Sequence, residues 1–211
     1  MIINYYGNLC VKAQFGDTVI AFNPPSKGEG KAPRFASDIV FISMNDKNYN
    51  GVSNMSGGRN EPFVISGPGE YEVGGIFVKG IGVEEKVKDE TKINTIYSVL
   101  VDDINLCHLG ALNISDLKPE MIETLGTIDI LFVPITGGDV LTPSLASKMT
   151  TLLEPKIIIP LYGNEKGVSS ESLKSYLKEE GSSGVSLDKL TIKKKDIEAK
   201  EGEIIILEPA I

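Results

Sequence analysis

The chain has 211 residues, a formal net charge of −8 and a pI near 4.8. This acidic balance argues against nucleic acid and anionic membranes as partners, because both bind basic surfaces. The length predicts one domain over residues 1–211. Two cysteines, Cys10 and Cys107, are too few for a disulfide framework. With no signal-peptide pattern and no long apolar stretch, we expect a cytoplasmic protein.

The first half of the chain carries short β-branched runs separated by turn residues, a pattern typical of strands. We predict strands at residues 2–6, 10–14, 18–22, 39–42, 62–66, 73–78, 93–101 and 104–108. Residues 84–92 mix both signs of charge, so we expect a solvated loop there. Residues 51–60 are rich in Gly and Asn and are expected to be irregular.

The second half alternates helical and strand patterns. We predict helices at 119–125, 143–153 and 170–179, and strands at 128–133, 157–159, 190–192 and 203–207. Residues 181–184 are expected to form a break and 193–196 a turn. Strands followed by alternating strands and helices, with no linker between the halves, indicate two sheets with helices outside.

Residues 38–50, DIVFISMNDKNYN, combine a buried strand with a polar loop, which is where α/β proteins usually hold their chemistry. This segment resembles the strand that precedes H-x-H-x-D-H in the metallo-β-lactamase superfamily. On that motif Met44, Asp46, Asn48 and Tyr49 stand at the positions of His, His, Asp and His. None of the four is the family's residue.

Further segments resemble the branch of that superfamily that includes ascorbate-6-phosphate lactonase-like hydrolases. They are the turn at 7–10 with the Asn-Pro pair at 23–24, the run GPGEYE at 67–72, and residues 106–112, 132–138 and 153–162. The resemblance implies an α/β fold, a four-layer αββα sandwich, with a binuclear zinc or manganese site. It places family ligands at His108 and at the positions now held by Ala111 and Tyr162. Asn8 and Asn23 replace a family His and Asp.

His108 is the one family ligand that the chain retains and its one histidine. A zinc site needs three or four N, S or O ligands, whereas methionine is a soft ligand and a tyrosine phenol titrates near 10. We therefore predict that the binuclear site is degenerate and that the protein has no metal cofactor. His108 and Asp46 are the remaining candidates for a reduced site, which Asp139 could complete.

Cys107 and His108 are neighbours, which suggests a Cys–His nucleophile. Successive side chains of a strand point to opposite faces, so the two would not meet. We expect Cys107 to be a small buried apolar residue. His108 is expected to be a neutral core histidine held by Tyr162 or Asn48.

These observations favour a non-catalytic protein that has lost the binuclear site and acts as a binding or interaction module for a small molecule or a protein. The alternative is a metal-dependent or metal-free hydrolase with a reduced site around Asp46, His108 and Tyr162. A third reading is a structural subunit that forms a homo-oligomer through strand edges or helices. In each case we expect seven positions to converge at the ends of the two sheets: Met44, Asp46, Asn48, Tyr49, His108, Ala111 and Tyr162.

Overall fold

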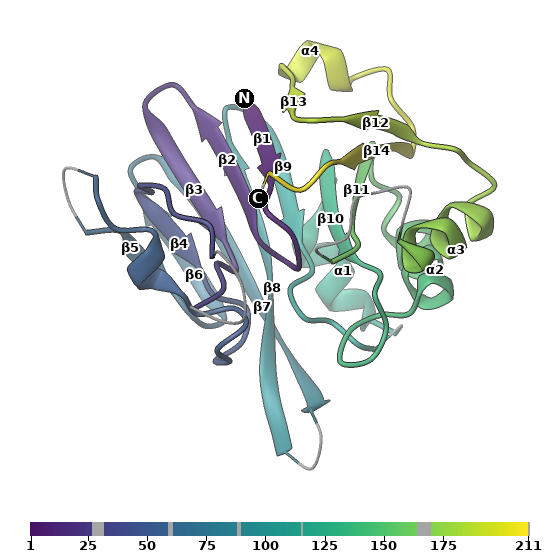
Figure 1. Ribbon diagram of the computed structural model, residues 1–211, viewed down its shortest axis with the longest axis horizontal. Coiled ribbons are helices and arrows are strands. Elements are labelled where there is room, and N and C mark those ends of the chain that lie inside the picture. Colours follow the sequence, from purple (N-terminus) through teal and green to yellow (C-terminus); the bar gives the residue numbers. More distant parts are fainter. Residues whose placement is uncertain (27–31, 59–60, 88–89, 115, 164–169, 211) are drawn as a thin grey trace.

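Two β-sheets pack face to face in the computed structural model (Figure 1), which describes residues 1–26, 32–58, 61–87, 90–114, 116–163 and 170–210. Among these residues one sheet has six strands in the order β13-β1-β2-β3-β4-β5 and the other has eight in the order β12-β14-β11-β10-β9-β8-β7-β6. The two sheets share one hydrophobic core. None of the described helices is long and apolar enough to cross a bilayer.

The six-stranded sheet begins as a meander. Its strands are β1 (Ile2–Tyr5), β2 (Val11–Phe15), β3 (Thr18–Phe22), β4 (Ile39–Phe41), β5 (Phe63–Ile65) and β13 (Leu190–Thr191). Strands β1, β2 and β3 pair antiparallel, and β4 and β5 are added in parallel. Strand β5 therefore forms one edge of this sheet.

The eight-stranded sheet is antiparallel on one side and parallel on the other. Its strands are β6 (Gly69–Val73), β7 (Ile76–Val87), β8 (Glu90–Val101), β9 (Ile104–His108), β10 (Ile130–Pro134), β11 (Ile157–Leu161), β12 (Val185–Leu187) and β14 (Glu203–Leu207). Strands β6 to β9 pair antiparallel, whereas β9, β10, β11 and β14 pair in parallel. Every residue of β10 and β11 is buried, as expected for parallel strands covered on both faces.

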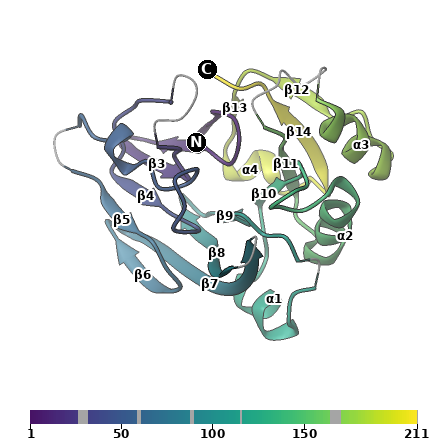
Figure 2. The ribbon, with the colours of Figure 1, turned by 60° about the horizontal axis from the view of Figure 1, so that its bottom comes forward.

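Helices α1 (Pro119–Leu125), α2 (Pro143–Leu153) and α3 (Glu171–Glu179) lie on the outer side of the eight-stranded sheet (Figures 1 and 2). Thr142 and Ser170 cap α2 and α3, since each side-chain oxygen accepts a backbone N–H of the first turn. The outer face of the six-stranded sheet packs on Phe35, Val52 and Met55, around the short 3₁₀ helix η1 (Val52–Asn54). The αββα sandwich is confirmed, and this second outer layer is thin.

An aromatic row joins the two sheets. The ring centroids of Phe22 and Phe41 are 4.9 Å apart, and those of Phe41 and Tyr97 are 5.1 Å apart. Phe22 also lies 6.0 Å from Phe132 of β10. Because these residues come from both sheets, the sandwich is fixed at the place where His108 ends β9.

The structure corrects the prediction of a solvated loop at residues 84–92. Strands β7 and β8 continue through it as a hairpin that extends beyond the sandwich (Figure 1). Glu84 lies opposite Ile93 and Glu85 opposite Lys92. The charged residues are strand-forming here because alternate side chains face opposite sides of the hairpin. The tip, residues 88–89, lies outside the described residues.

Smaller differences concern three short segments. The strand predicted at residues 73–78 is interrupted by a turn at Gly74 and Gly75, so that β6 ends before this turn and β7 begins after it. Strand β12 was not predicted, and the expected turn at 193–196 is the short helix α4 (Lys194–Ile197). These elements are too short to give a periodic pattern, so their secondary structure depends on contacts with distant parts of the chain.

Candidate functional site

His108 lies between the two sheets and is 1% exposed. Its Nε2 is 3.1 Å from the carbonyl oxygen of Leu9, in the turn between β1 and β2. Its Nδ1 accepts a 2.9 Å hydrogen bond from the backbone N–H of Gly110. The proton is therefore on Nε2, and the lone pair of Nδ1 is occupied. Neither nitrogen is free for a metal or a substrate.

The surroundings of His108 are apolar. Its ring stacks on Phe22 with centroids 5.1 Å apart and lies 5.7 Å from the Phe132 ring. Burial lowers the pKa of His108 to about 4, because the imidazolium form loses its hydration, and the Leu9 hydrogen bond offsets this only in part. His108 is a neutral core histidine, as expected. The expectation that Tyr162 or Asn48 holds it is wrong, since backbone groups do so.

Two buried amides connect the segments around His108. Asn23 donates to Ser43 Oγ at 2.9 Å and accepts from the Ser43 backbone N–H at 2.8 Å. Asn94 donates to the Leu109 carbonyl at 2.9 Å and accepts from the Ala111 N–H at 2.8 Å. Each amide thus uses its donor and its acceptor inside the protein. The sequence interpretation missed Asn94, although an Asn within the apolar run of β8 was a usable signal.

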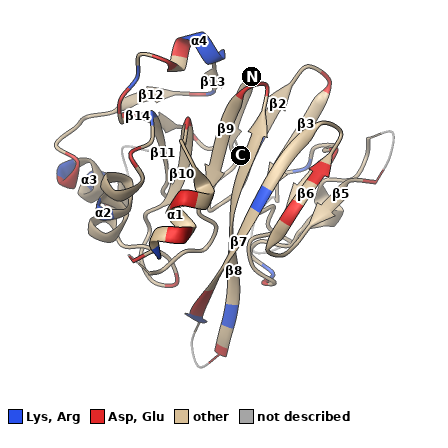
Figure 3. Ribbon diagram, turned by 180° about the vertical axis from the view of Figure 1, so that it is seen from behind, with Lys and Arg blue, Asp and Glu red and all other residues tan. Residues whose placement is uncertain are grey.

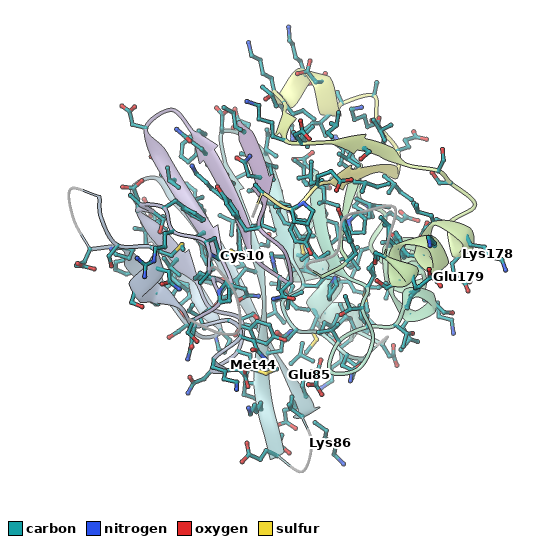
Figure 4. The ribbon with its side chains drawn as sticks, in the orientation of Figure 1. Cys10, Met44, Glu85, Lys86, Lys178 and Glu179 are labelled. Carbon is teal, nitrogen blue, oxygen red and sulfur yellow. The ribbon has the colours of Figure 1, made fainter. Side chains whose placement is uncertain are left out.

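The side chains of Met44 and Ala111 contribute only apolar atoms to this region. Met44 is 3% exposed and Ala111 is 1% exposed, and both belong to the main hydrophobic core. Figure 4 shows Met44 near the place where the β7–β8 hairpin leaves the sandwich. These two positions, which carry ligands in the family pattern, pack as core residues here.

Asp46 is engaged at the rim. Its Oδ1 accepts from the backbone N–H of Asn48 at 3.0 Å, and its Oδ2 is 3.2 Å from Lys92 Nζ. The Asn48 N–H is the main cause that lowers the pKa of Asp46, and Lys92 adds to it. The half-buried Tyr49 has its pKa raised to about 12 by burial and by the carboxylates of Asp46 and Asp139. Asp46 is therefore an ionised partner of a lysine.

Tyr162 is directed to the C-terminal strand. Its hydroxyl donates a 2.8 Å hydrogen bond to the Leu207 carbonyl, and burial raises its pKa. Its ring lies 5.5 Å from the Tyr5 ring. The Tyr5 hydroxyl in turn lies 2.8 Å from the Asn8 carbonyl oxygen. Tyr162 is thereby linked through Tyr5 to the β1–β2 turn, which also carries the Leu9 carbonyl that binds His108.

A small pocket of about 210 Å³ lies over this region. Its lining residues are Asn8, Leu9, Asn48, Tyr49, Thr136 and Val140. The pocket brings Asn48 and Tyr49 to the turn whose Leu9 carbonyl binds His108. Met44, His108, Ala111 and Tyr162 are buried and do not line it. Four of the seven predicted positions therefore meet at the β1–β2 turn, namely Asn48, Tyr49, His108 and Tyr162. The seven positions do not form one open site.

The fold implies a metal, and the donors do not fit one. The described residues contain no group of three or more His, Cys, Asp or Glu side chains arranged to hold an ion. His108 is saturated by backbone groups, and Asp46 is paired with Lys92. Asp139 is exposed, whereas His108 is buried. Cys107 is also buried, and burial raises its thiol pKa, so it is no activated nucleophile.

A sequence model of the β-lactamase superfamily domain matches residues 2–162, which is most of the chain. The chain belongs to the metallo-β-lactamase superfamily. This match covers the strand-rich half and extends to Tyr162 at the end of β11. The family predicted from the motifs is therefore confirmed.

Named relatives of this superfamily member are described as hydrolases. A UPF0173 metal-dependent hydrolase from Lysinibacillus sphaericus (strain C3-41) is 25% identical over an alignment of 198 residues, and the match covers 78% of this chain and 86% of the relative. A Thermotoga maritima crystal structure, provisionally assigned as a Zn-dependent hydrolase of the metallo-β-lactamase superfamily, is 25% identical with a TM-score of 0.75 and covers 98% of this chain and 97% of that one. Igni18, a metallo hydrolase from Ignicoccus hospitalis KIN4/I, is 14% identical with a TM-score of 0.64, covers 99% of this chain and 95% of that one, and shows the fold alone.

These names favour the hydrolase alternative over a non-catalytic role. None of the three relatives is described as a lactonase, so the branch suggested by GPGEYE stays a prediction. The side chains at the family's ligand positions favour a non-catalytic role instead, because they are bonded to other protein groups.

Proposed function

We propose that this protein is a non-catalytic member of its superfamily that keeps the sandwich and binds another molecule with it. The observation that supports this most is the state of His108. Both ring nitrogens are engaged by backbone groups, and the pKa of the ring is lowered to about 4. A general base works best with a pKa near the operating pH, so this imidazole is a poor one.

The rest of the site supports the same proposal. Metal-assisted hydrolysis requires a cation that lowers the pKa of a bound water from 15.7 to about 7. Met44 and Ala111 offer no suitable donor, and Tyr162 is bonded to Leu207. The pocket of about 210 Å³ is also smaller than the roughly 300–1,000 Å³ of ordinary small-molecule sites.

A hydrolase with a reduced site around Asp46, His108 and Tyr162 is the second candidate. The names of the relatives favour it. It would require His108 to exchange its bonds with Leu9 and Gly110 for a substrate or an ion. It would also require Asp46 to leave Lys92.

Metal content and turnover separate the two candidates. We expect purified protein to hold far less than one equivalent of zinc or manganese by elemental mass spectrometry. We also expect no turnover of lactone, phosphodiester or β-lactam substrates above the blank, with or without either ion. The matched pair of variants is His108→Ala at the site and Lys86→Ala on the exposed side of the hairpin. Turnover that His108→Ala abolishes and Lys86→Ala retains would establish the hydrolase instead.

A further inference from the structure

A large pocket that does not involve the positions of the former metal site lies on the outer face of β6 to β9, beside α1. A pocket of about 640 Å³ is formed there by residues of β6, β7, β8, the β8–β9 turn, and α1 with the segment that follows it. Glu72, Phe77 and Leu100 lie in one row, because Phe77 is in register with Glu72 on β6 and with Leu100 on β8. We call this surface the β6–α1 face.

The floor of the β6–α1 face is apolar and open to solvent. Phe77 is 53% exposed and Leu100 is 44% exposed, and they are directly paired across two strands. Helix α1 contacts β7 beside them, where Lys79 Nζ lies 3.5 Å from the Thr124 carbonyl oxygen. An aromatic and an aliphatic side chain exposed side by side in a pocket are typical of an interaction site.

The rim of this face is acidic. Figure 3 shows acidic positions on β6 and α1, on either side of a basic position on β7. Within the described part of the chain, four exposed lining carboxylates form no ion pair: Glu70, Glu72, Asp103 and Glu123. Lys156 and Lys194 line the same pocket but pair with the buried Asp129, at 3.5 Å and 2.7 Å. Two lysines on one carboxylate leave a net charge of +1, and Lys79 adds another. The described lining of five carboxylates and three lysines therefore keeps a net charge of −2.

We propose that the β6–α1 face binds a short segment of a partner protein that carries an apolar side chain next to lysine or arginine. The apolar side chain would pack on Phe77 and Leu100, and the cations would meet the four free carboxylates. A second copy of this chain is a poor occupant, because each copy has a net charge of −8. Phosphate-bearing ligands are repelled for the same reason.

The β6–α1 face specifies which class of partner the proposed binding role would involve. This inference rests on the proposed function only in part. The β6–α1 face shares no lining residue with the pocket of Asn48 and Tyr49. Hydrolase activity at the former metal site would therefore leave this proposal standing, and loss of peptide binding would leave the absence of turnover standing.

The test is selection of a displayed library of random twelve-residue peptides on the immobilised full-length protein. Enriched peptides are then synthesised, and their affinity is measured by fluorescence anisotropy at two salt concentrations. We expect lysine or arginine next to an aromatic or aliphatic residue, and weaker binding at high salt. Phe77→Ser and Glu72→Lys should each weaken binding about tenfold or more. Phe63→Ser, which removes an equally exposed aromatic on β5, is the matched control and should change nothing.

Three results would overturn the proposal. The first is selection without enrichment of basic apolar peptides. The second is an affinity that Phe77→Ser leaves unchanged, or that Phe63→Ser lowers equally, with thermal melts showing that both variants fold. The third is a dimer in sedimentation velocity that Phe77→Ser dissociates, because a second copy would then cover this face.

Discussion

Glu85 and Lys92 lie directly opposite each other at the base of the β7–β8 hairpin, and each holds a different loop. Glu85 Oε1 accepts a 2.9 Å hydrogen bond from the backbone N–H of Asn113, and Lys92 pairs with Asp46 at 3.2 Å. Those two loops carry the family's ligand positions on either side of the site. A metal bound to both loops would hold them together. Here one cross-strand pair of the hairpin connects them instead.

Removing Glu85 should cost more than removing Lys92. Glu85→Leu leaves the Asn113 N–H without its acceptor, so we expect a loss of about 1–3 kcal/mol in the free energy of unfolding. Lys92→Met removes a partly exposed ion pair and should cost about 0.2–1 kcal/mol. Urea unfolding measures both.

Two controls define this result. Glu85→Gln keeps a side-chain oxygen for Asn113 and should recover most of the loss. Lys86→Leu changes the exposed neighbour of Glu85 (Figure 4) and should stay within about 0.5 kcal/mol of wild type. Equal losses for Glu85→Leu and Lys86→Leu would contradict the role of Glu85.

The depressed pKa of His108 makes stability depend on pH. The folded protein holds His108 neutral down to about pH 4, whereas the unfolded chain protonates it near pH 6.5. Between these values the unfolded state binds the additional proton, so stability falls as the pH drops. Up to about 1.4 kcal/mol is lost per pH unit, or about 2 kcal/mol between pH 7 and pH 5.

The measurement compares wild type with His108→Asn by urea unfolding at pH 7 and pH 5. The asparagine amide can donate to Leu9 but does not titrate, so the stability advantage of wild type should shrink by about 2 kcal/mol at pH 5. Glu85, whose pKa is raised by burial, acts with the opposite sign, but it is present in both proteins and cancels. An advantage that is the same at both pH values would show that His108 titrates normally in the folded state.

Restoring one family ligand should harm the protein. Ala111→Asp places a carboxylate at a position that is 1% exposed, where the backbone N–H already bonds to Asn94. We expect a loss of about 3–5 kcal/mol, because the new charge is buried without a partner. Ile114→Asp, on the same loop but 38% exposed, should cost less than about 1 kcal/mol. Tight zinc binding by Ala111→Asp in a calorimetric titration would mean that the site is nearer to a metal centre than its hydrogen bonds indicate.

Alanine substitutions at Gly110 and Gly126 distinguish the cost of a steric clash from the cost of backbone strain. Both have a φ near +65°, but a Cβ on Gly110 would lie 2.4 Å from Asn94 Oδ1 and 2.6 Å from Ser43 Cβ, whereas a Cβ on Gly126 would meet nothing within 4 Å. Gly126 has a ψ of −157°, in a region essentially restricted to glycine, so Gly126→Ala should cost about 1–3 kcal/mol from strain alone. Gly110→Ala should cost at least about 2 kcal/mol more, because the Asn94 network must move as well. Thermal unfolding measures both, and equal losses would contradict the close packing at Gly110.

Local patterns were reliable where a segment is a continuous apolar run or has a helical period. The apolar runs of β4, β10 and β11 and the helical patterns of α2 and α3 were recognisable without a structure. The hairpin of β7 and β8 was not, because alternating charge is as common in solvated loops as in exposed strands. Its identity depends on in-register pairing between two segments, and a linear pattern does not report that pairing.

The sequence by itself determined that the family's ligands are missing. A methionine at 44 and an alanine at 111 provide no hard N or O donor wherever the chain places them. Only the tertiary structure decided which hydrogen-bond partners the remaining polar side chains near the former metal site have. His108 bonds to Leu9, 99 positions away, and Glu85 bonds to Asn113 on another loop. Such partners are chosen by the packing of two sheets against each other, because a buried polar group takes whichever partner the fold brings within reach.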